Sequence, residues 1–428
     1  MRRLIYIFII GLLLCSYTWA DGSRYASKSL LSEGKWVKIR VDKTGIYKLS
    51  YADLKNMGFS DPSKVSVHGY GGWPLDEDFS KEYIDDVPST PVWRGSDYLL
   101  FYGKGPVKWE YDSSSQTFVH TNNPYSLYGY YFVTDATPTN DMTSVAQASG
   151  ATNRITTYDD YLVHEQELVS LAKSGRELYG EDFSGATPRT LSTFSSIPGI
   201  TNEDAKVTMS FVSKVTSGTG VASLSINQSN VLDVSIRSNR EEYVKALEGV
   251  STAVWKGEKS EKNSVVVSYN SASHNNVRLN YVRLHFKRTL QPYGAYTFFR
   301  SIASIGNVSR FVVQGANANT LVFDVTDAQR VRLMETELNG SELTFSIPAG
   351  TLREFVLVRT DQSFISPEVV GEVENQNLHA LEQKDMIIIA AKAFQTQAER
   401  LAEEHRATDG LTVEVVDPQS IYNEFSSG

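Results

Sequence analysis

The feature that most constrains the fold is a series of short segments in which apolar and polar residues alternate. Val207–Val212, Ser264–Tyr269 and Val277–Arg288 show the alternation most clearly. A period of two residues is typical of a β-strand with one buried face. In the last segment the phase slips at Val282, which indicates a β-bulge. Many such strands, joined by short turns without intervening helices, predict a jelly-roll-like β-sandwich over residues 156–375.

A second β-rich domain is predicted before the sandwich, over residues 21–155. Lys35–Val41 alternates charged and bulky residues, and Ile46–Leu49 returns after a turn. Ser50 is a favourable N-cap for a short helix at Tyr51–Met57. Further short strands with turn residues between them complete an all-β pattern.

Two stretches near the predicted domain boundary lack this alternation. Residues 136–154 are rich in Thr, Ser, Asn and Ala, which predicts a linker or a long loop. Tyr161–Phe183 is expected to be partly helical. The pattern therefore places the boundary between the two β-rich domains near residue 155.

The character of the chain changes at its C-terminal end. Met386–Ala391 is a continuous apolar run, typical of a strand that is buried on both faces. A helical pattern follows over Phe394–His405, and Leu411–Val416 is a second apolar strand. Pro418–Phe425 predicts another helix, with Asp417 as its N-cap. This β-α-β-α order is the opening of a parallel α/β sheet.

One βαβ unit cannot bury both faces of its own sheet. We therefore expect residues 380–428 to be the start of an α/β domain that this sequence does not complete. The half-built sheet would also leave a strand edge open to solvent. From about Lys384 onward, we expect the isolated chain to be sensitive to proteolysis.

The N-terminus has the pattern of a secretory signal peptide over residues 1–20. Arg2 and Arg3 precede an apolar run that ends at Cys15, and small residues lead to a cleavage position before Asp21. The run is too short to span a bilayer comfortably, because a spanning helix needs about 20 residues. An alternative is a lipoprotein signal with Cys15 as the lipidated residue. The protein is therefore predicted to be exported.

Cleavage of the signal would remove Cys15, which is the single cysteine of the sequence. The mature chain would then form no disulfide and would hold no thiolate nucleophile or ligand. The two signal arginines leave 39 basic against 50 acidic residues, a net charge of −11. Because nucleic acids require a clustered basic face, the acidic surface argues against a nucleic-acid partner.

The sequence contains few signs of a catalytic or ligand site. Tyr70–Gly72 lacks the residues of a phosphate-binding loop and is interpreted as a turn. The nucleophile-elbow and HExxH patterns are absent, so no catalytic or cofactor-binding residue is assigned. An acidic loop gives a weak calcium hypothesis, without the spacing of an EF-hand. Its residues are Asp76, Glu77, Asp78, Glu82, Asp85 and Asp86. The seven histidines are scattered and are assigned structural roles.

Two segments of the sequence resemble one family. The first is Ser29–Val41 with Thr44–Leu49, and the second is Asp385–Ile389 with the residues from Gln397 to Gly428. Together they are similar to surface sortases of type IX secretion, which carry a gingipain-type cysteine peptidase domain. Asn280–Leu284 also looks like that family, so the resemblance extends over nearly the whole chain.

The resemblance implies a caspase-like α/β peptidase domain with a His and Cys dyad. In the family that dyad lies downstream of the match to Ile421–Phe425, so no catalytic residue is carried over and His405 is not the dyad histidine. The implied function is that of a surface protease of Bacteroidetes that removes the C-terminal secretion domain of cargo proteins. The implied partners are an outer-membrane β-barrel with other secretion components, secreted cargo and lipopolysaccharide.

The resulting hypothesis is that the chain is the non-catalytic N-terminal part of such a sortase, and that it is inactive alone. One alternative is a stand-alone surface adhesin or carbohydrate-binding β-sandwich, since Tyr and Trp on sheets can stack on sugars. Another is a self-contained hydrolase that uses carboxylates. No spaced pair of acids supports the hydrolase, and an adhesin would have no use for a β-α-β-α tail.

Overall fold

The computed structural model describes residues 25–428 except 79, 82, 84, 172, 174, 175, 240–245, 273 and 275. The predicted signal peptide, residues 1–20, lies outside the described residues. The chain divides into two compact units. Unit 1 comprises Met1–Val37, Leu75–Pro88 and Glu372–Gly428, and unit 2 comprises Lys38–Pro74 and Ser89–Gly371.

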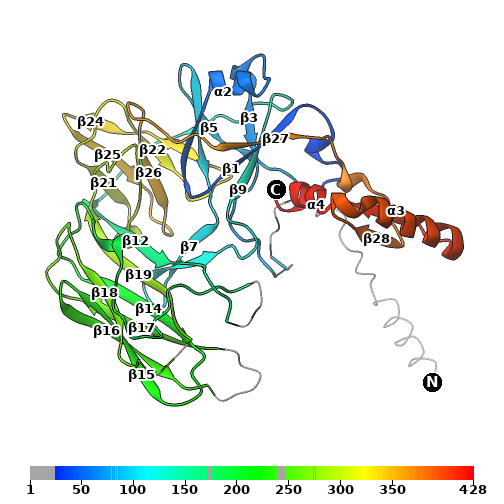
Figure 1. Ribbon diagram of the computed structural model, residues 1–428. Helices are drawn as coiled ribbons and strands as arrows, with labels where there is room; N and C mark the ends of the chain where they lie inside the picture. Colours follow the sequence, from blue (N-terminus) through cyan, green and yellow to red (C-terminus); the bar gives the residue numbers. More distant parts are fainter. Residues whose placement is uncertain are drawn as a thin grey trace, which may run out of the picture. The chain divides into compact units, whose positions relative to one another are not determined.

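Most of unit 2 is built on one nine-stranded sheet (Figure 1). The predicted mainly β fold is therefore confirmed. In spatial order the strands are β10 (Ser144–Val145), β23 (Arg332–Met334), β22 (Thr320–Asp324), β26 (Glu354–Arg359), β20 (Tyr296–Arg300), β12 (Thr157–Glu165), β19 (Val277–Thr289), β14 (Ala205–Ser213) and β17 (Leu247–Trp255).

Two smaller sheets each contribute to a core with part of the large sheet. One contains β13 (Arg189–Thr190), β18 (Val265–Tyr269), β15 (Thr219–Ile226) and β16 (Ser229–Arg237). The other contains β11 (Asn153–Ile155), β21 (Ser309–Val313), β25 (Glu342–Ile347) and β24 (Glu337–Asn339). The first core gathers residues of β14, β15, β16, β18 and β19, and Figure 1 shows these strands together in green.

The second core is dominated by four phenylalanines that contact one another. Phe311 and Phe345 are stacked with ring centroids 5.0 Å apart, and Phe299 stacks on Phe355 at 5.4 Å. All four side chains are fully buried. Such aromatic pairs add about 0.5–1.5 kcal/mol each beyond the area they bury. The large sheet thus contributes to two separate hydrophobic cores.

The remaining β-elements form smaller sheets. One has five strands: β27 (Glu368–Val373), β1 (Trp36–Val41), β9 (Gly129–Thr134), β3 (Ser66–His68) and β4 (Ser89–Thr90). A three-stranded sheet contains β2 (Gly45–Ser50), β6 (Tyr98–Gly103) and β5 (Val92–Arg94), and β7 (Val107–Asp112) forms a hairpin with β8 (Thr117–Asn122). Ile46 and Leu100 of the three-stranded sheet share a hydrophobic core with Val356 and Val358 of β26.

Several local predictions are confirmed. Helix α2 (Tyr51–Asn56) has Ser50 as its N-cap, and the Ser50 hydroxyl accepts a hydrogen bond from Asp53 N in a capping box. The predicted phase slip is a bulge in β19: Ser210 is paired with Tyr281 and Phe211 with Leu279, so Asn280 is left over. The bulge therefore lies two residues before the position expected from the alternation.

One further local prediction holds for most of its residues, and another is wrong. Residues 136–154 are mostly irregular, as predicted for a long loop, but they contain β10 and the start of β11. Both strands pair in parallel with strands far along the chain. Tyr161–Phe183 is not helical in its described residues: β12 continues to Glu165, and isolated bridges follow at Val169, Tyr179 and Asp182. Nothing in the structure tests the predicted domain boundaries, which stay predictions.

The C-terminal β-α-β-α order of unit 1 is confirmed. Strand β28 (Met386–Ile389) pairs in parallel with β29 (Val413–Val416), and α3 (Gln395–Glu404) connects them. A π-helical turn at His405–Asp409 ends α3, and Gly410 follows in the left-handed conformation with φ of 69°. Such a conformation favours glycine, which has no Cβ to clash with the backbone. Helix α4 (Pro418–Phe425) completes the segment.

Candidate functional site

Two residues mark the start of helix α4, the N-cap Asp417 and the first helical residue Pro418. The carboxylate of Asp417 accepts a hydrogen bond from Gln419 N at 3.1 Å, and Pro418 occupies the first turn. Proline is favourable there because its backbone has no N–H and its φ is already helical. The helix carries Glu424 into the interior of unit 1, where its side chain is fully buried. A buried carboxylate needs compensating hydrogen bonds, and their donors define the first candidate site.

Glu424 is held by a turn that precedes β28. Its carboxylate accepts hydrogen bonds from Gln376 Nε2 at 2.9 Å, Leu378 N at 2.8 Å and His379 N at 3.1 Å. His379 Nδ1 lies 2.5 Å from the same carboxylate, and His379 Nε2 lies 2.9 Å from Asp85 Oδ1. We call Asp85, His379 and Glu424 the histidine clasp. Because a carboxylate accepts at each ring nitrogen, both nitrogens donate and the imidazole carries a positive charge.

The histidine clasp joins three segments of unit 1 that are far apart in the sequence. Asp85 lies in the segment between β3 and β4, His379 lies before β28, and Glu424 lies in α4. The imidazole also stacks on Phe425, with ring centroids 4.5 Å apart. Burial disfavours the charged ring, but the hydrogen bonds that it donates to Asp85 and Glu424 outweigh this effect and raise the pKa of His379.

This raised pKa predicts a pH-dependent stability of unit 1. A folded-state pKa above the ordinary value of 6.5 contributes stability that is complete below about pH 6.5. The contribution is lost as the pH rises through the raised pKa. We expect hydrogen exchange of α4 amides, corrected for intrinsic rates, to show protection that falls as the pH rises above about 6.5. His379→Gln should flatten this dependence; an equal dependence in the variant would contradict the assignment.

One face of the C-terminal segment is apolar and exposed. In β28, Ile387 is 57% exposed and Ile389 is 61% exposed, although the sequence predicts burial on both faces. Phe394 and Leu401 nearby are also exposed. An isolated monomer rarely exposes neighbouring large apolar side chains, so this face has the character of a surface that another element covers.

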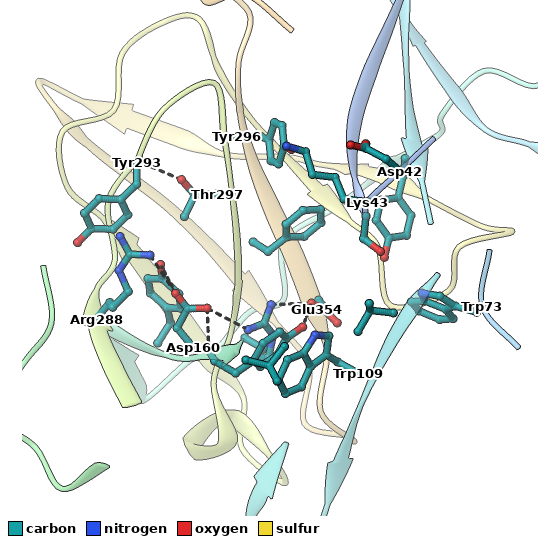
Figure 2. A pocket seen from close by; sticks show the side chains of 18 residues that line it. Asp42, Lys43, Trp73, Trp109, Asp160, Arg288, Tyr293, Tyr296, Thr297 and Glu354 are labelled. Carbon is teal, nitrogen blue, oxygen red and sulfur yellow. Dashed lines mark hydrogen bonds and ion pairs between the residues drawn. The ribbon is translucent and has the colours of Figure 1, made fainter. Parts of the chain in front are cut away.

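The pocket in Figure 2 is the second candidate site and lies within unit 2. It encloses about 430 Å³ and is lined by residues of β7, β12, β20 and β26, together with the Asp42–Thr44 turn. Arg300 is fully buried: its Nη2 donates to Glu354 Oε1 at 2.6 Å and its Nη1 to the carbonyl of Asp159 at 3.1 Å. Arg288 Nη1 pairs with Asp160 Oδ2 at 2.9 Å. The volume is in the range of small-molecule sites, about 300–1,000 Å³.

Comparison with known proteins gives two findings. Residues 379–428 match Peptidase family C25. The crystal structure of dimeric latent PorU from Porphyromonas gingivalis superposes with a TM-score of 0.87 and 33% sequence identity, over 94% of this chain. The chain is a PorU-like protein. It spans 39% of the PorU chain that it matches.

Two other solved structures are only weakly similar to the PorU-like chain. An insecticidal delta-endotoxin of Bacillus thuringiensis, Cry8Ea1, is 10% identical over 51% of this chain and 41% of its own, with a TM-score of 0.21. A cycloisomaltooligosaccharide glucanotransferase of Paenibacillus sp. is 6% identical over 51% of this chain and 47% of its own, with a TM-score of 0.18. No curated protein matches. Among the described residues, no helix has the length and apolar character needed to cross a membrane.

Each histidine of the PorU-like chain has a hydrogen-bonding partner. His405, at the end of α3, contacts Asp409 with its Nδ1 at 2.7 Å, away from the clasp. The other partners are Thr137 for His68, Glu165 for His120, Glu181 for His164, Tyr269 for His274 and Asp159 for His285. Only the clasp joins a histidine to two carboxylates within the described ranges.

The acidic loop does not gather around one point. Asp76 pairs with Lys81, and Asp78 accepts from Ser80. Asp86 accepts from Ser29 Oγ at 2.7 Å, whereas Asp85 belongs to the clasp. Glu82 lies outside the described residues. Over the part of the chain that the structure describes, no group of three or more His, Cys, Asp or Glu side chains is arranged to hold a metal ion.

The turn at Tyr70–Gly72 packs around a buried lysine. Gly72 N donates to the Lys104 carbonyl at 2.9 Å. The Lys104 ammonium lies 3.5 Å from the ring centroid of Tyr70 and 4.6 Å from that of Trp73. Burial, reinforced by repulsion from Lys108, lowers the pKa of Lys104 to about 7. The turn therefore has a structural role, as the sequence indicates.

The lowered pKa of Lys104 predicts an opposite pH effect in unit 2. Between about pH 7 and pH 10.5 the unfolded chain binds more protons at this lysine than the folded one. Stability therefore rises with pH across that window. We expect Lys104→Met to unfold at a higher temperature than the wild type at pH 6, with a smaller difference at pH 10. A lower melting temperature of the variant at pH 6 would contradict this interpretation.

Proposed function

We propose that this chain is the non-catalytic N-terminal region of a PorU-like sortase of type IX secretion. The observation that supports the proposal is the similarity to latent PorU over 94% of the chain, together with the C25 match at residues 379–428. Its β-rich region would position a C25 peptidase domain at the bacterial surface. That domain would remove C-terminal secretion domains from cargo proteins and attach the cargo to lipopolysaccharide.

The exposed face of β28 and α3 supports this proposal. Ile387 and Ile389 of β28 are largely exposed. Residues of a C25 domain beyond this segment would cover them and complete the parallel sheet, because both faces of such sheets are normally buried. The clasp would then hold the start of the peptidase domain against the Leu75–Pro88 segment of unit 1.

The partners follow from the same proposal. An outer-membrane β-barrel and other secretion components would hold the chain at the cell surface, and cargo would be presented to the peptidase. The acidic composition fits a soluble surface-exposed protein and provides no basic face for nucleic acid. The predicted signal peptide, residues 1–20, would direct export.

A co-purification experiment tests the proposal. The tagged chain is expressed with its N-terminal 20 residues in a Bacteroidetes cell, and a matched version that begins at Asp21 serves as the control. We expect the first version to reach the surface, to be digested by protease added to whole cells, and to co-purify with the secretion β-barrel. The control should stay protected. Export into the medium without any association with the barrel would contradict the proposed role.

A further inference from the structure

The pocket of unit 2 is lined by residues outside the segment that matches family C25, and the proposed function assigns it no role. We propose that it is a binding site for a neutral saccharide that contains a hexose unit. The inference rests on the aromatic walls, the balance of charge and the free hydrogen-bonding atoms of the pocket. It is independent of the peptidase relationship, because all lining residues belong to unit 2.

The walls provide ring faces of two tryptophans and several tyrosines. Trp109 lines the pocket and stacks on Tyr161, with ring centroids 4.0 Å apart and planes 18° apart. Trp73 and Tyr296 add further aromatic surface, and Figure 2 shows Trp73 and Trp109 along the same side of the cavity. The C–H groups on the face of a sugar ring pack favourably on such π-faces. The stack with Tyr161 fixes the Trp109 ring before any ligand arrives.

The charges of the pocket balance one another. Asp42, Asp160 and Glu354 are offset by Lys43, Arg288 and Arg300. The inner charges are already paired, Arg288 with Asp160 and Arg300 with Glu354. At these two ion pairs an anion would compete with the carboxylates and a cation with the arginines, so neither gains an unneutralised partner there. A neutral ligand keeps both ion pairs intact.

Three polar atoms remain available for such a ligand. Glu354 uses Oε1 for Arg300 and Tyr161, which leaves Oε2 as an acceptor. Arg288 uses Nη1 for Asp160 and Nε for the Pro198 carbonyl, which leaves Nη2 as a donor. The Tyr296 hydroxyl, for which burial raises the pKa, keeps its proton and can donate or accept.

These free atoms favour hydroxyl groups over a purely apolar ligand. A hydrocarbon would displace water from Glu354 Oε2 and Arg288 Nη2 without offering either atom a hydrogen-bonding partner, which is unfavourable. A hexose presents adjacent hydroxyls that can both donate and accept, along with an apolar face. Planar side chains that are fixed by ion pairs, such as Glu354 and Arg288, are well suited to bind two neighbouring hydroxyls.

The test is a calorimetric titration of residues 21–428. The probes are glucose, galactose, mannose, N-acetylglucosamine, maltose, cellobiose and lactose, with glucose 6-phosphate and a proline-rich peptide as competing classes. We expect at least one neutral sugar to bind with a Kd of about 1 mM or tighter and to quench tryptophan fluorescence. Trp109→Ala should weaken binding at least about tenfold, and Tyr296→Phe about threefold or more.

Controls keep the test independent of folding. Tyr125→Ala removes an aromatic ring that is 77% exposed and does not line the pocket, and it should bind sugar like the wild type. Trp109→Phe replaces the alanine variant if melting curves show that the latter does not fold. Three results would each overturn the proposal. The first is that no neutral sugar binds with a Kd below about 10 mM, and the second is that both pocket variants bind sugar as tightly as the wild type. The third is that glucose 6-phosphate or the peptide binds more tightly than every neutral sugar.

Discussion

Glu424→Ala is expected to weaken the C-terminal segment by about 3–5 kcal/mol. The carboxylate is fully buried and accepts hydrogen bonds from Gln376 Nε2 and Leu378 N. It also accepts from the backbone N and the ring Nδ1 of His379. Alanine would leave His379 Nδ1–H and the backbone N–H groups of Leu378 and His379 without acceptors, while the imidazolium would keep only Asp85 as a partner. Hydrogen exchange of the α4 amides should accelerate by more than about a hundredfold, since 1.4 kcal/mol corresponds to a factor of ten.

Glu403→Ala is the matched control for this prediction. Glu403 lies on α3 in the same unit, is exposed and has the same side chain, so its replacement should change exchange rates by less than about threefold. Glu424→Gln should fall between the two variants, because it keeps the shape and loses the charge opposite His379. If Glu424→Ala behaved like the control, the histidine clasp would not hold α4.

Arg300→Ala is expected to cost unit 2 about 3–5 kcal/mol. The guanidinium is fully buried, pairs with Glu354 at 2.6 Å and donates to the Asp159 carbonyl. Its plane also lies over the Tyr161 ring, 4.3 Å from the centroid. Removal leaves a carboxylate and a carbonyl oxygen unpaired between β12, β20 and β26. Urea unfolding should show the loss as a lower midpoint with little change in slope.

Two comparisons isolate the role of the guanidinium. Arg330→Ala removes an arginine whose side chain is 82% exposed, and it should alter stability by less than about 0.5 kcal/mol. Arg300→Lys keeps the charge but cannot reach both acceptors with a planar group, so it should recover only part of the loss. Destabilisation by Arg300→Ala of less than about 1 kcal/mol would show that the strands are not held together at this ion pair.

Local signals in the sequence were sufficient for parts of the fold. Ser50 and Asp417 are N-caps whose side chains act within three residues, so α2 and α4 follow from adjacent residues alone. The alternation in Val277–Arg288 likewise follows from one strand with one buried face. The α/β opening was predictable because its apolar strands and its caps are close together in the sequence.

Long-range pairing explains what the sequence did not predict. Ser144 is paired with Leu333, and Tyr161 is paired with His285. Because these partners lie far away in the sequence, the residues around Ser144 and Tyr161 do not by themselves indicate a strand. Within the polar stretch of residues 136–154, the short strand β10 and the start of β11 form because distant strands offer their edges. One sheet that contributes to two cores could not be inferred from composition for the same reason.

The candidate sites were hidden by the same distances. Asp85 and His379 of the clasp are 294 positions apart, and His379 has no motif around it in the sequence. The pocket brings Trp109 of β7 next to Tyr161 of β12 and Arg300 of β20, which belong to separate predicted segments. A fully buried Glu424 beside a helix terminus could have been suspected only from the resemblance of the final segment to a peptidase family.

The absence of a cysteine after residue 20 makes the central claim directly measurable. A C25-type peptidase requires a thiolate nucleophile, and Cys15 would leave with the signal peptide. Purified residues 21–428 should therefore not hydrolyse denatured casein above the buffer blank, while an active cysteine peptidase in the same assay does. Casein cleavage that follows the chain through size-exclusion chromatography would contradict the assignment of this region as non-catalytic.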